Sequence, residues 1–390
     1  MTESSDDERT RRLWTAAIVL FVALEGLGLQ MRGPLLPILE AEWGISKSLQ
    51  GLVSPAGTLG FALTVLGVGA IAGRVDTRRY FFAGVAVTVV GVVGMALAPF
   101  FLAYLAFLVV RGLGTGVSRG LDRPLLGHLY PNARGRVFNL YDMAWALGAA
   151  AGPAVLSLAV AQGDWRYAYA ALAVAFAFVA LLVWRLKPPD VSTEAQLDVG
   201  AALALLKMPA VAATTIALIF HTGLEGAMFI WLPTFGSEIA GFDQETASLL
   251  LSAFVVAYVP GRLFYTFIAE RVGYGPLVVT LEVLIVPTFL WTFFVADGLA
   301  TFAGVAVLGA LVSGIFPTLL AFGTQVAPEY SGPINGLATA TASVSIALVP
   351  VAMGALADAS SIRSAMWIPL ALTLLVAPTV VIARRIDPNI

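Results

Sequence analysis

The chain has no cysteine, only two histidines in 390 residues, and few charged side chains, which make up 12% of its composition. Without cysteine there can be no disulfide, thiolate chemistry or iron–sulfur cluster. His128 and His221 are too far apart in the sequence to predict a metal site. The sequence has no basic run that would indicate a nucleic-acid partner. It also has no Gly-Lys-Ser/Thr phosphate loop, which an ATP-driven pump would need. We therefore expect neither an enzyme nor a bound cofactor.

Long apolar runs dominate what is present. Hydrophobic residues make up 59% of the chain, and its charged fraction is about half of the roughly 25% found in soluble domains. A transmembrane helix needs about 20 apolar residues, and runs of that length recur throughout. The predicted spans are 14–39, 49–72, 80–98, 100–127, 138–160, 167–185, 209–236, 246–269, 276–296, 299–323, 334–356 and 364–383. The sequence predicts an all-α protein of the cell membrane with twelve transmembrane helices in the lipid bilayer.

A polar stretch at 187–208 divides the twelve spans into two sets of six. It predicts a cytoplasmic linker between an N-terminal six-helix bundle at 14–186 and a C-terminal six-helix bundle at 209–385. The polar ends at 1–13 and 386–390 are expected to be cytoplasmic tails.

Residues with special backbone roles repeat at a constant offset. The segment Ile71-Ala72-Gly73-Arg74-Val75 recurs as Ile268-Ala269-Glu270-Arg271-Val272, and 271 − 74 = 197. The same offset relates Gly112 to Gly309, Pro131 to Pro328, Gly135 to Gly332 and Pro153 to Pro350. A repeat of this length predicts that the second six helices reuse the architecture of the first, as two pseudo-repeats.

Basic residues gather on one side of the predicted membrane. That side receives Arg9, Arg11, Arg12, Arg74, Arg78, Arg79, Arg134, Arg136, Lys187, Lys207, Arg271, Arg384 and Arg385. The other side receives only Lys47, Arg166 and Arg363. Because cytoplasmic loops carry an excess of Lys and Arg, both termini are expected in the cytoplasm.

Three segments resemble signatures of the major facilitator superfamily of transporters. Gly73-Arg74-Val75-Asp76-Thr77-Arg78-Arg79 is similar to a shortened form of the signature between helices 2 and 3. Arg111-Gly112-Leu113-Gly114-Thr115-Gly116 resembles the helix 4 signature, and Gly148-Ala149-Ala150-Ala151-Gly152-Pro153 the Gly-Pro signature of helix 5. The resemblance covers nearly the whole chain. It implies a monomer in which helices 1, 4, 7 and 10 line a central cavity and two halves rock around it.

Ionisable residues fall in three of these four helices. A charge at bilayer depth is costly and persists mainly where it faces water, a partner or a substrate. Helix 1 carries Glu25 and Arg32, helix 4 carries Arg111, and helix 7 carries His221 and Glu225. The expected substrate and ion pathway residues are Glu25, Arg32, Arg111, Asp142, His221, Glu225 and Trp231.

The charges of helices 1 and 4 each have two interpretations. Glu25 lies midway through its span, so its carboxylate either exchanges a coupling proton or pairs with an arginine of helix 4. Arg111 keeps its charge and needs a counter-charge, from Glu25 or Asp142, either for coupling or as a fixed ion pair. Arg32 lies nearer the outer end, where it contacts substrate or snorkels to the headgroups.

Helix 7 carries the most distinctive sequence pattern of the chain. His221 and Glu225 are four residues apart and share a helix face. With Trp231-Leu232-Pro233-Thr234 and Ile315-Phe316-Pro317-Thr318, this stretch resembles the fucose–proton symporter branch and related sugar permeases. The resemblance implies that Glu225 anchors hydroxyl groups or the coupling ion and that Trp231 stacks on a sugar; Trp231 is otherwise an aromatic of the outer membrane interface. Arg119 departs from that branch, which carries an acidic residue there.

Charged residues at the cytoplasmic ends of the spans have two interpretations. They either form a cytoplasmic gate or only fix the membrane topology. Asp76 with Arg78 and Arg79, and Glu270 with Arg271, are expected to bridge helix ends. The gate candidates are Arg74, Asp76, Arg78, Arg79, Arg119, Asp122, Glu270 and Arg271. Pro153 and Pro350, each in the middle of a span, predict matching bends.

The preferred functional interpretation is a secondary active transporter. It would move a small polar solute, sugar-like or another organic compound, by alternating access in symport with protons or sodium. The alternatives are a drug–proton antiporter, indicated by the Gly-Pro segment of helix 5; an organic anion transporter, indicated by Arg32, Arg111 and Arg119; and a non-transporting membrane sensor. The expected partners are the solute, a coupling ion and the bilayer.

Overall fold

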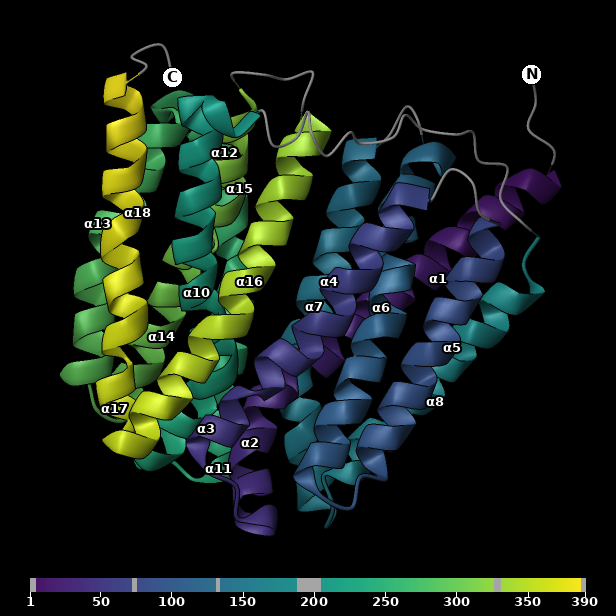
Figure 1. Ribbon diagram of the computed structural model, residues 1–390, viewed down its shortest axis with the longest axis horizontal. Helices are drawn as coiled ribbons and strands as arrows, with labels where there is room; N and C mark the ends of the chain where they lie inside the picture. Colours follow the sequence, from purple (N-terminus) through teal and green to yellow (C-terminus); the bar gives the residue numbers. More distant parts are fainter. Residues whose placement is uncertain (1–4, 72–75, 131–133, 188–204, 326–330, 387–390) are drawn as a thin grey trace. The chain divides into compact units, whose positions relative to one another are not determined.

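The computed structural model describes residues 5–71, 76–130, 134–187, 205–325 and 331–386, and every regular element in these ranges is a helix (Figure 1). Eleven helical segments of the described chain are long and apolar enough to cross a membrane. The 19-residue helix α4 (Val53–Ile71) lies where the remaining span is predicted. The prediction of an all-α membrane protein with twelve spans is therefore confirmed.

The first compact unit comprises residues 1–35 and 56–196. Its helices are α1 (Ser5–Gln30), α4, α5 (Thr77–Ala96), α6 (Phe101–Leu129), α7 (Arg134–Ala161) and α8 (Arg166–Arg185). Helix α5 packs on α6 and α8, and α1 packs on α7. Glycines of α6 allow close approach: a Cβ atom at Gly112 would lie 2.8 Å from the carbonyl oxygen of Gly57, and one at Gly114 would lie 2.4 Å from the amide nitrogen of Thr88.

The second compact unit comprises residues 36–55 and 197–390. Its helices are η2 (Leu205–Lys207), α10 (Pro209–Glu238), α11 (Gln244–Val256), α12 (Tyr258–Val272), α13 (Tyr274–Phe294), α14 (Leu299–Val312), α15 (Ile315–Thr324), α16 (Ser331–Ala359), α17 (Ile362–Ala365) and α18 (Trp367–Ile386). Helix α10 packs on α11, α15, α16 and α18, so it forms the centre of the unit. Two predicted spans are each built from two helices: α11 and α12, and α14 and α15.

Residues 36–55 belong to the second unit although they lie in the first half of the sequence. They include most of α2 (Arg32–Trp43) and the short α3 (Lys47–Gly51), which packs on α16 (Figure 1). The carboxylate of Asp358 on α16 accepts bonds from the backbone nitrogens of Lys47 and Ser48, both at 2.8 Å, and from Ser48 Oγ at 2.5 Å. The expected division at 14–186 and 209–385 assigned residues 36–55 to the first bundle, whereas they belong to the second unit. The expected linker lies mostly outside the described residues.

The mid-helix proline of α16 explains a second contact of this segment. Pro350 has no N–H group, so the carbonyl oxygen of Ile346, one turn earlier, lacks its usual helical donor. Ser54 Oγ donates to that oxygen at 2.5 Å. Helices α7 and α16 both continue through their prolines, Pro153 and Pro350, and the bends at these residues stay a prediction.

Candidate functional site

The first unit holds a buried ionic cluster between helices α1, α6 and α7. Arg119 Nη1 lies 3.8 Å from Glu25 Oε2, and its Nε lies 3.9 Å from Asp122 Oδ2. Tyr141 Oη donates to Asp122 Oδ2 at 2.5 Å, and the Arg119 guanidinium lies 5.1 Å from the centre of the Tyr141 ring. Two carboxylates and an aromatic ring thus surround one guanidinium. Arg119 and Asp122 are both gate candidates from the sequence, and their gating role stays a prediction.

Arg111 does not form the expected ion pair with Glu25 or Asp142. Arg111 is only 1% exposed, and its Nη2 donates to the backbone carbonyl of Glu25 at 3.3 Å. The Glu25 carboxylate pairs with Arg119 instead. Asp142 bonds Arg123 at 2.6 Å, in a pair whose side chains are about half exposed. Asp142 therefore pairs with Arg123 and not with Arg111.

Arg32 is buried, which corrects the snorkelling interpretation. Its guanidinium covers Gly57, where a Cβ atom would lie 2.2 Å from Arg32 Nη1. The Arg111 guanidinium reaches Gly28 in the same way, at 3.1 Å from a Cβ there. Glycine at both positions leaves space that a larger residue would fill.

Two tyrosines complete the surroundings of these arginines. The Tyr104 and Tyr169 hydroxyl groups bond each other at 3.1 Å and are fully enclosed. Both hydroxyls lie within electrostatic range of Arg32 and Arg111. Neither arginine forms an ion pair with a carboxylate in the part of the chain that the structure describes.

The second unit holds its own cluster, built on α10 and α12. His221 Nε2 lies 3.8 Å from Glu225 Oε1, so the predicted shared face is confirmed. Tyr258 Oη donates to the same oxygen at 2.8 Å, and the Arg262 guanidinium lies 5.3 Å from the centre of the Tyr258 ring. Glu225 is 8% exposed. This arrangement can hold a carboxylate that accepts a proton or binds a polar group.

Trp231 does not offer a stacking surface in this structure. Its side chain is fully buried, and Nε1 donates to the carbonyl oxygen of Pro350 at 3.1 Å. The ring packs beside Gly354. Both earlier interpretations, an interfacial aromatic and an exposed sugar-stacking ring, are corrected: here Trp231 joins α10 to α16.

The charged residues that were expected to bridge helix ends on the cytoplasmic side have other partners in the structure. Asp76 accepts a bond from the backbone nitrogen of Arg79 at 3.0 Å and pairs with the Arg79 side chain, so it caps its own helix rather than joining two helices. Arg78 donates to the carbonyl oxygen of Trp184 at the end of α8. Arg271 is exposed. Arg74 and the side chain of Glu270 lie outside the described residues.

Three polar residues were absent from the predicted site: Tyr258 and Glu282, which are buried, and Arg262, which is half-buried. Arg262 and Glu282 lie within predicted apolar spans, at 246–269 and 276–296. The rule that singled out Glu25 and Glu225, an ionisable side chain at bilayer depth, also applies to them. Tyr258 carried no such signal, because buried tyrosines are common and only the fold brings its hydroxyl to Glu225.

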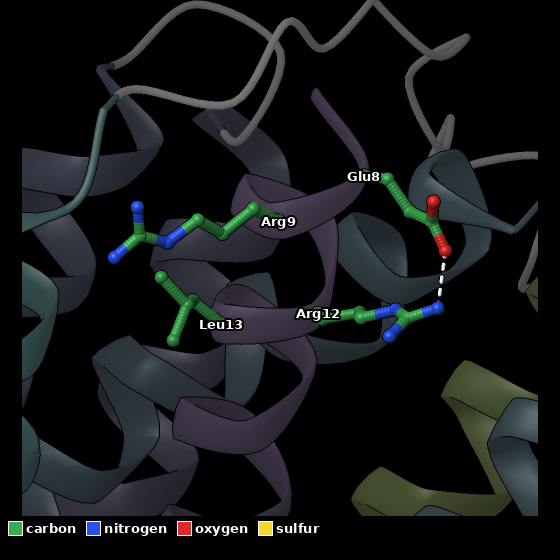
Figure 2. A pocket seen from close by; sticks show the side chains of 4 residues that line it. All are labelled: Glu8, Arg9, Arg12 and Leu13. Carbon is green, nitrogen blue, oxygen red and sulfur yellow. Dashed lines mark hydrogen bonds and ion pairs between the residues drawn. The ribbon is translucent and has the colours of Figure 1, made fainter. Parts of the chain in front are cut away.

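A surface pocket lies at the first turns of α1. Figure 2 shows that Glu8, Arg9, Arg12 and Leu13 line it and that Glu8 and Arg12 form an ion pair one turn apart. Its residues belong to neither buried cluster. Among the described residues, no group of three His, Cys, Asp or Glu side chains could hold a metal ion.

Known proteins with related sequences are membrane transporters. The sequence matches the profile of the Major Facilitator Superfamily over residues 18–332 and 237–389. The 3-(3-hydroxy-phenyl)propionate transporter of Escherichia coli (strain K12) is 27% identical over 81% of this chain and 78% of its own. The uncharacterized MFS-type transporter YfkL of Bacillus subtilis (strain 168) is 21% identical over 83% and 84%.

Solved structures share the fold. A bacterial homologue of the human lysosomal transporter Spinster has a TM-score of 0.82 at 14% identity, covering 98% of each chain. The D-xylose–proton symporter has a TM-score of 0.76 at 14% identity, covering 94% of this chain and 96% of its own. Because the profile covers most of the sequence, the chain belongs to the Major Facilitator Superfamily and is a membrane transporter, not an enzyme.

Proposed function

We propose that this transporter carries a small organic anion across the membrane by alternating access, in symport with a proton. The observation that carries the proposal is the charge of the first unit. Arg32 and Arg111 are buried and Arg119 is half-buried, whereas the buried carboxylates among the described residues of this unit are Glu25 and Asp122. The two carboxylates both belong to the Arg119 cluster.

Among the described residues, neither Arg32 nor Arg111 forms an ion pair with a carboxylate, and a buried unpaired charge is unfavourable. An anionic substrate would supply the missing charge when it binds. The planar guanidinium donates two parallel bonds that match a carboxylate. A neutral sugar would offer hydroxyl groups but would leave the two cations uncompensated.

The Tyr104 and Tyr169 rings give this region aromatic character next to the two guanidiniums. Two relatives support this chemistry by name: one is a 3-(3-hydroxy-phenyl)propionate transporter, and the other, 23% identical over 76% of this chain, is a probable 4-methylmuconolactone transporter of Cupriavidus pinatubonensis. We infer a small aromatic or unsaturated carboxylate as the substrate class.

Glu225 supports the choice of a proton as the coupling ion. It is a membrane-embedded carboxylate that accepts a hydrogen bond from Tyr258 and lies beside the imidazole of His221. Carboxylates and histidines at this depth are typical proton relays. Symport of a sugar is the second candidate, supported by the helix 7 pattern.

The test compares ligands of equal shape and different charge. Purified protein in proteoliposomes is expected to take up a phenylpropionate faster when the outside is acidic, and to ignore both its primary amide and D-xylose. Loss of bonds to a charged partner costs about 1.5–3 kcal/mol, so Arg111→Gln should weaken phenylpropionate binding about 10- to 100-fold. Arg12→Gln, in the exposed ion pair with Glu8, is the matched control. Equal uptake of acid and amide contradicts the anion proposal, and uptake of D-xylose alone supports the sugar.

A further inference from the structure

The second unit holds another membrane-embedded carboxylate, Glu282, which lies outside both clusters, near the middle of α13. Its residue is 2% exposed. Neither carboxyl oxygen has a hydrogen-bond partner among the described residues. Its neighbours on the buried face of α13 are apolar, and include Val278, Leu281 and Ile285. It therefore differs from Glu225, which accepts a bond from Tyr258.

The helices packed on α13 bring no cation to this carboxyl. They are α12, α14, α15 and α18. Helices α14 and α15 contain no ionisable residue. The only charged residues of α18 are Arg384 and Arg385 in its last turn. Arg384 packs beside Gly275, which is 282 − 275 = 7 residues from Glu282, or about 10 Å along the helix.

Helix α12 carries five titratable residues. Tyr258 and Arg262 belong to the Glu225 cluster, and Glu270 and Arg271 lie at the end of α12. The remaining one, Tyr265, packs against Gly314, which also approaches Leu281. Tyr265 and Leu281 thus approach the same glycine, and Tyr265 is uncharged at neutral pH.

Among the described residues, an ionised carboxylate in this position would have no hydrogen-bond or ion-pair partner, and it would be buried away from solvent. Proteins avoid that state by neutralising the group, and the bilayer supplies no water in its place. A protonated carboxyl has no net charge and is tolerated there. We propose that Glu282 is a proton-binding site of the second unit and carries its proton in this conformation.

The site lies beside a discontinuity in the neighbouring span. Helix α14 ends at Val312 and α15 begins at Ile315, and Gly314 between them approaches Leu281, the residue before Glu282. A purely structural position on α13 would be filled as well by leucine. The position of Glu282 next to a break in the packed helix provides a route by which a change in that break exposes the carboxyl.

The test measures the protonation state and is independent of the transported substrate. Infrared spectra of the purified protein in lipid at about pH 7 are compared between wild type and Glu282→Gln. We expect the difference spectrum to show loss of the carbonyl stretch of a protonated carboxylic acid. Glu245→Gln, the same change at an exposed residue of α11, should instead show loss of carboxylate bands.

Loss of carboxylate bands in Glu282→Gln would overturn the proposal, because it would show that the side chain is ionised. If this variant does not fold, Glu282→Asp replaces it: the acid carbonyl band should then shift in frequency. An unshifted acid band in Glu282→Asp would equally overturn the proposal. Neither outcome bears on the anion substrate, so the two proposals fail separately.

Discussion

Glu225 is held by side chains from two helices. Tyr258 donates a 2.8 Å hydrogen bond from α12, and His221 lies one turn away on α10. Enclosed polar networks of this kind fix one rotamer, because the alternatives leave groups unpaired. The geometry therefore keeps one carboxyl oxygen, Oε1, oriented toward both partners.

Glu225→Gln tests whether this carboxylate couples transport to protons. Glutamine keeps the shape, and its amide oxygen still accepts the bond from Tyr258, so the variant should fold with an unchanged melting temperature. Because the amide does not take up a proton at neutral pH, we expect uptake driven by a pH gradient to be lost while exchange of labelled for unlabelled substrate persists. The measurement is uptake in proteoliposomes with and without the gradient, with Glu245→Gln as the control. Equal gradient dependence in Glu225→Gln and wild type would assign coupling to another group.

At the scale of elements, a proline in α16 creates an acceptor that a serine near the start of α4 uses. Ser54 and Ile346 are far apart in the sequence and meet at 2.5 Å. The carbonyl of Ile346 is available because residue 350 is proline. The hydrogen bond therefore depends on Pro350 as well as on Ser54, which donates it.

A double-mutant cycle tests this dependence. Ser54→Ala should lower the free energy of unfolding by about 0.5–1.5 kcal/mol, the typical net contribution of one hydrogen bond. Pro350→Ala supplies a backbone N–H to Ile346, so Ser54→Ala should cost less in that background. The measurement is chemical or thermal unfolding of the four proteins in the same detergent. Equal costs in both backgrounds would contradict the role of the proline.

At the scale of the whole molecule, residues 36–55 connect two stretches of the first unit yet pack within the second. Lys47 Nζ pairs with both Glu40 and Glu238. Burial alone would lower the pKa of Lys47, but its hydrogen bonds to the two carboxylates outweigh burial and raise the pKa. A raised pKa means that this contribution to stability is complete at neutral pH and is lost only as the pH rises above about 10. Since both carboxylates are partly exposed, salt should weaken the pairs.

A disulfide tests whether this packing has to open during transport. The chain has no native cysteine, so Ser48→Cys with Asp358→Cys gives one defined pair at positions whose side chains are in contact. Under oxidising conditions we expect uptake to be lost, and a reductant should restore it, because alternating access requires the segment to separate from α16. Each single variant serves as a control. Full uptake by the cross-linked protein would show that residues 36–55 stay with the second unit throughout the cycle.

Local composition predicts the number and approximate limits of the spans and their division into two sets of six. The positions of glycine and proline predict that the second set repeats the first. The shared face of His221 and Glu225 and the pairing of Arg119 with Asp122 were also predictable, since both follow from helical periodicity. The 19-residue α4 and the broken spans fall within the predicted apolar runs for the same reason.

The partners of the charges were not predictable in this way. Arg111 bonds a backbone carbonyl, Asp142 pairs with Arg123, and Asp358 caps α3. Which side chains meet depends on the rotation of each helix about its axis and on neighbours hundreds of residues away. The sequence by itself determined a membrane bundle of two repeated halves, because hydrophobicity and helix periodicity are local properties. Only the tertiary structure decided which buried ionisable groups are paired and which, like Glu282, have no partner among the described residues, because pairing requires contact in space.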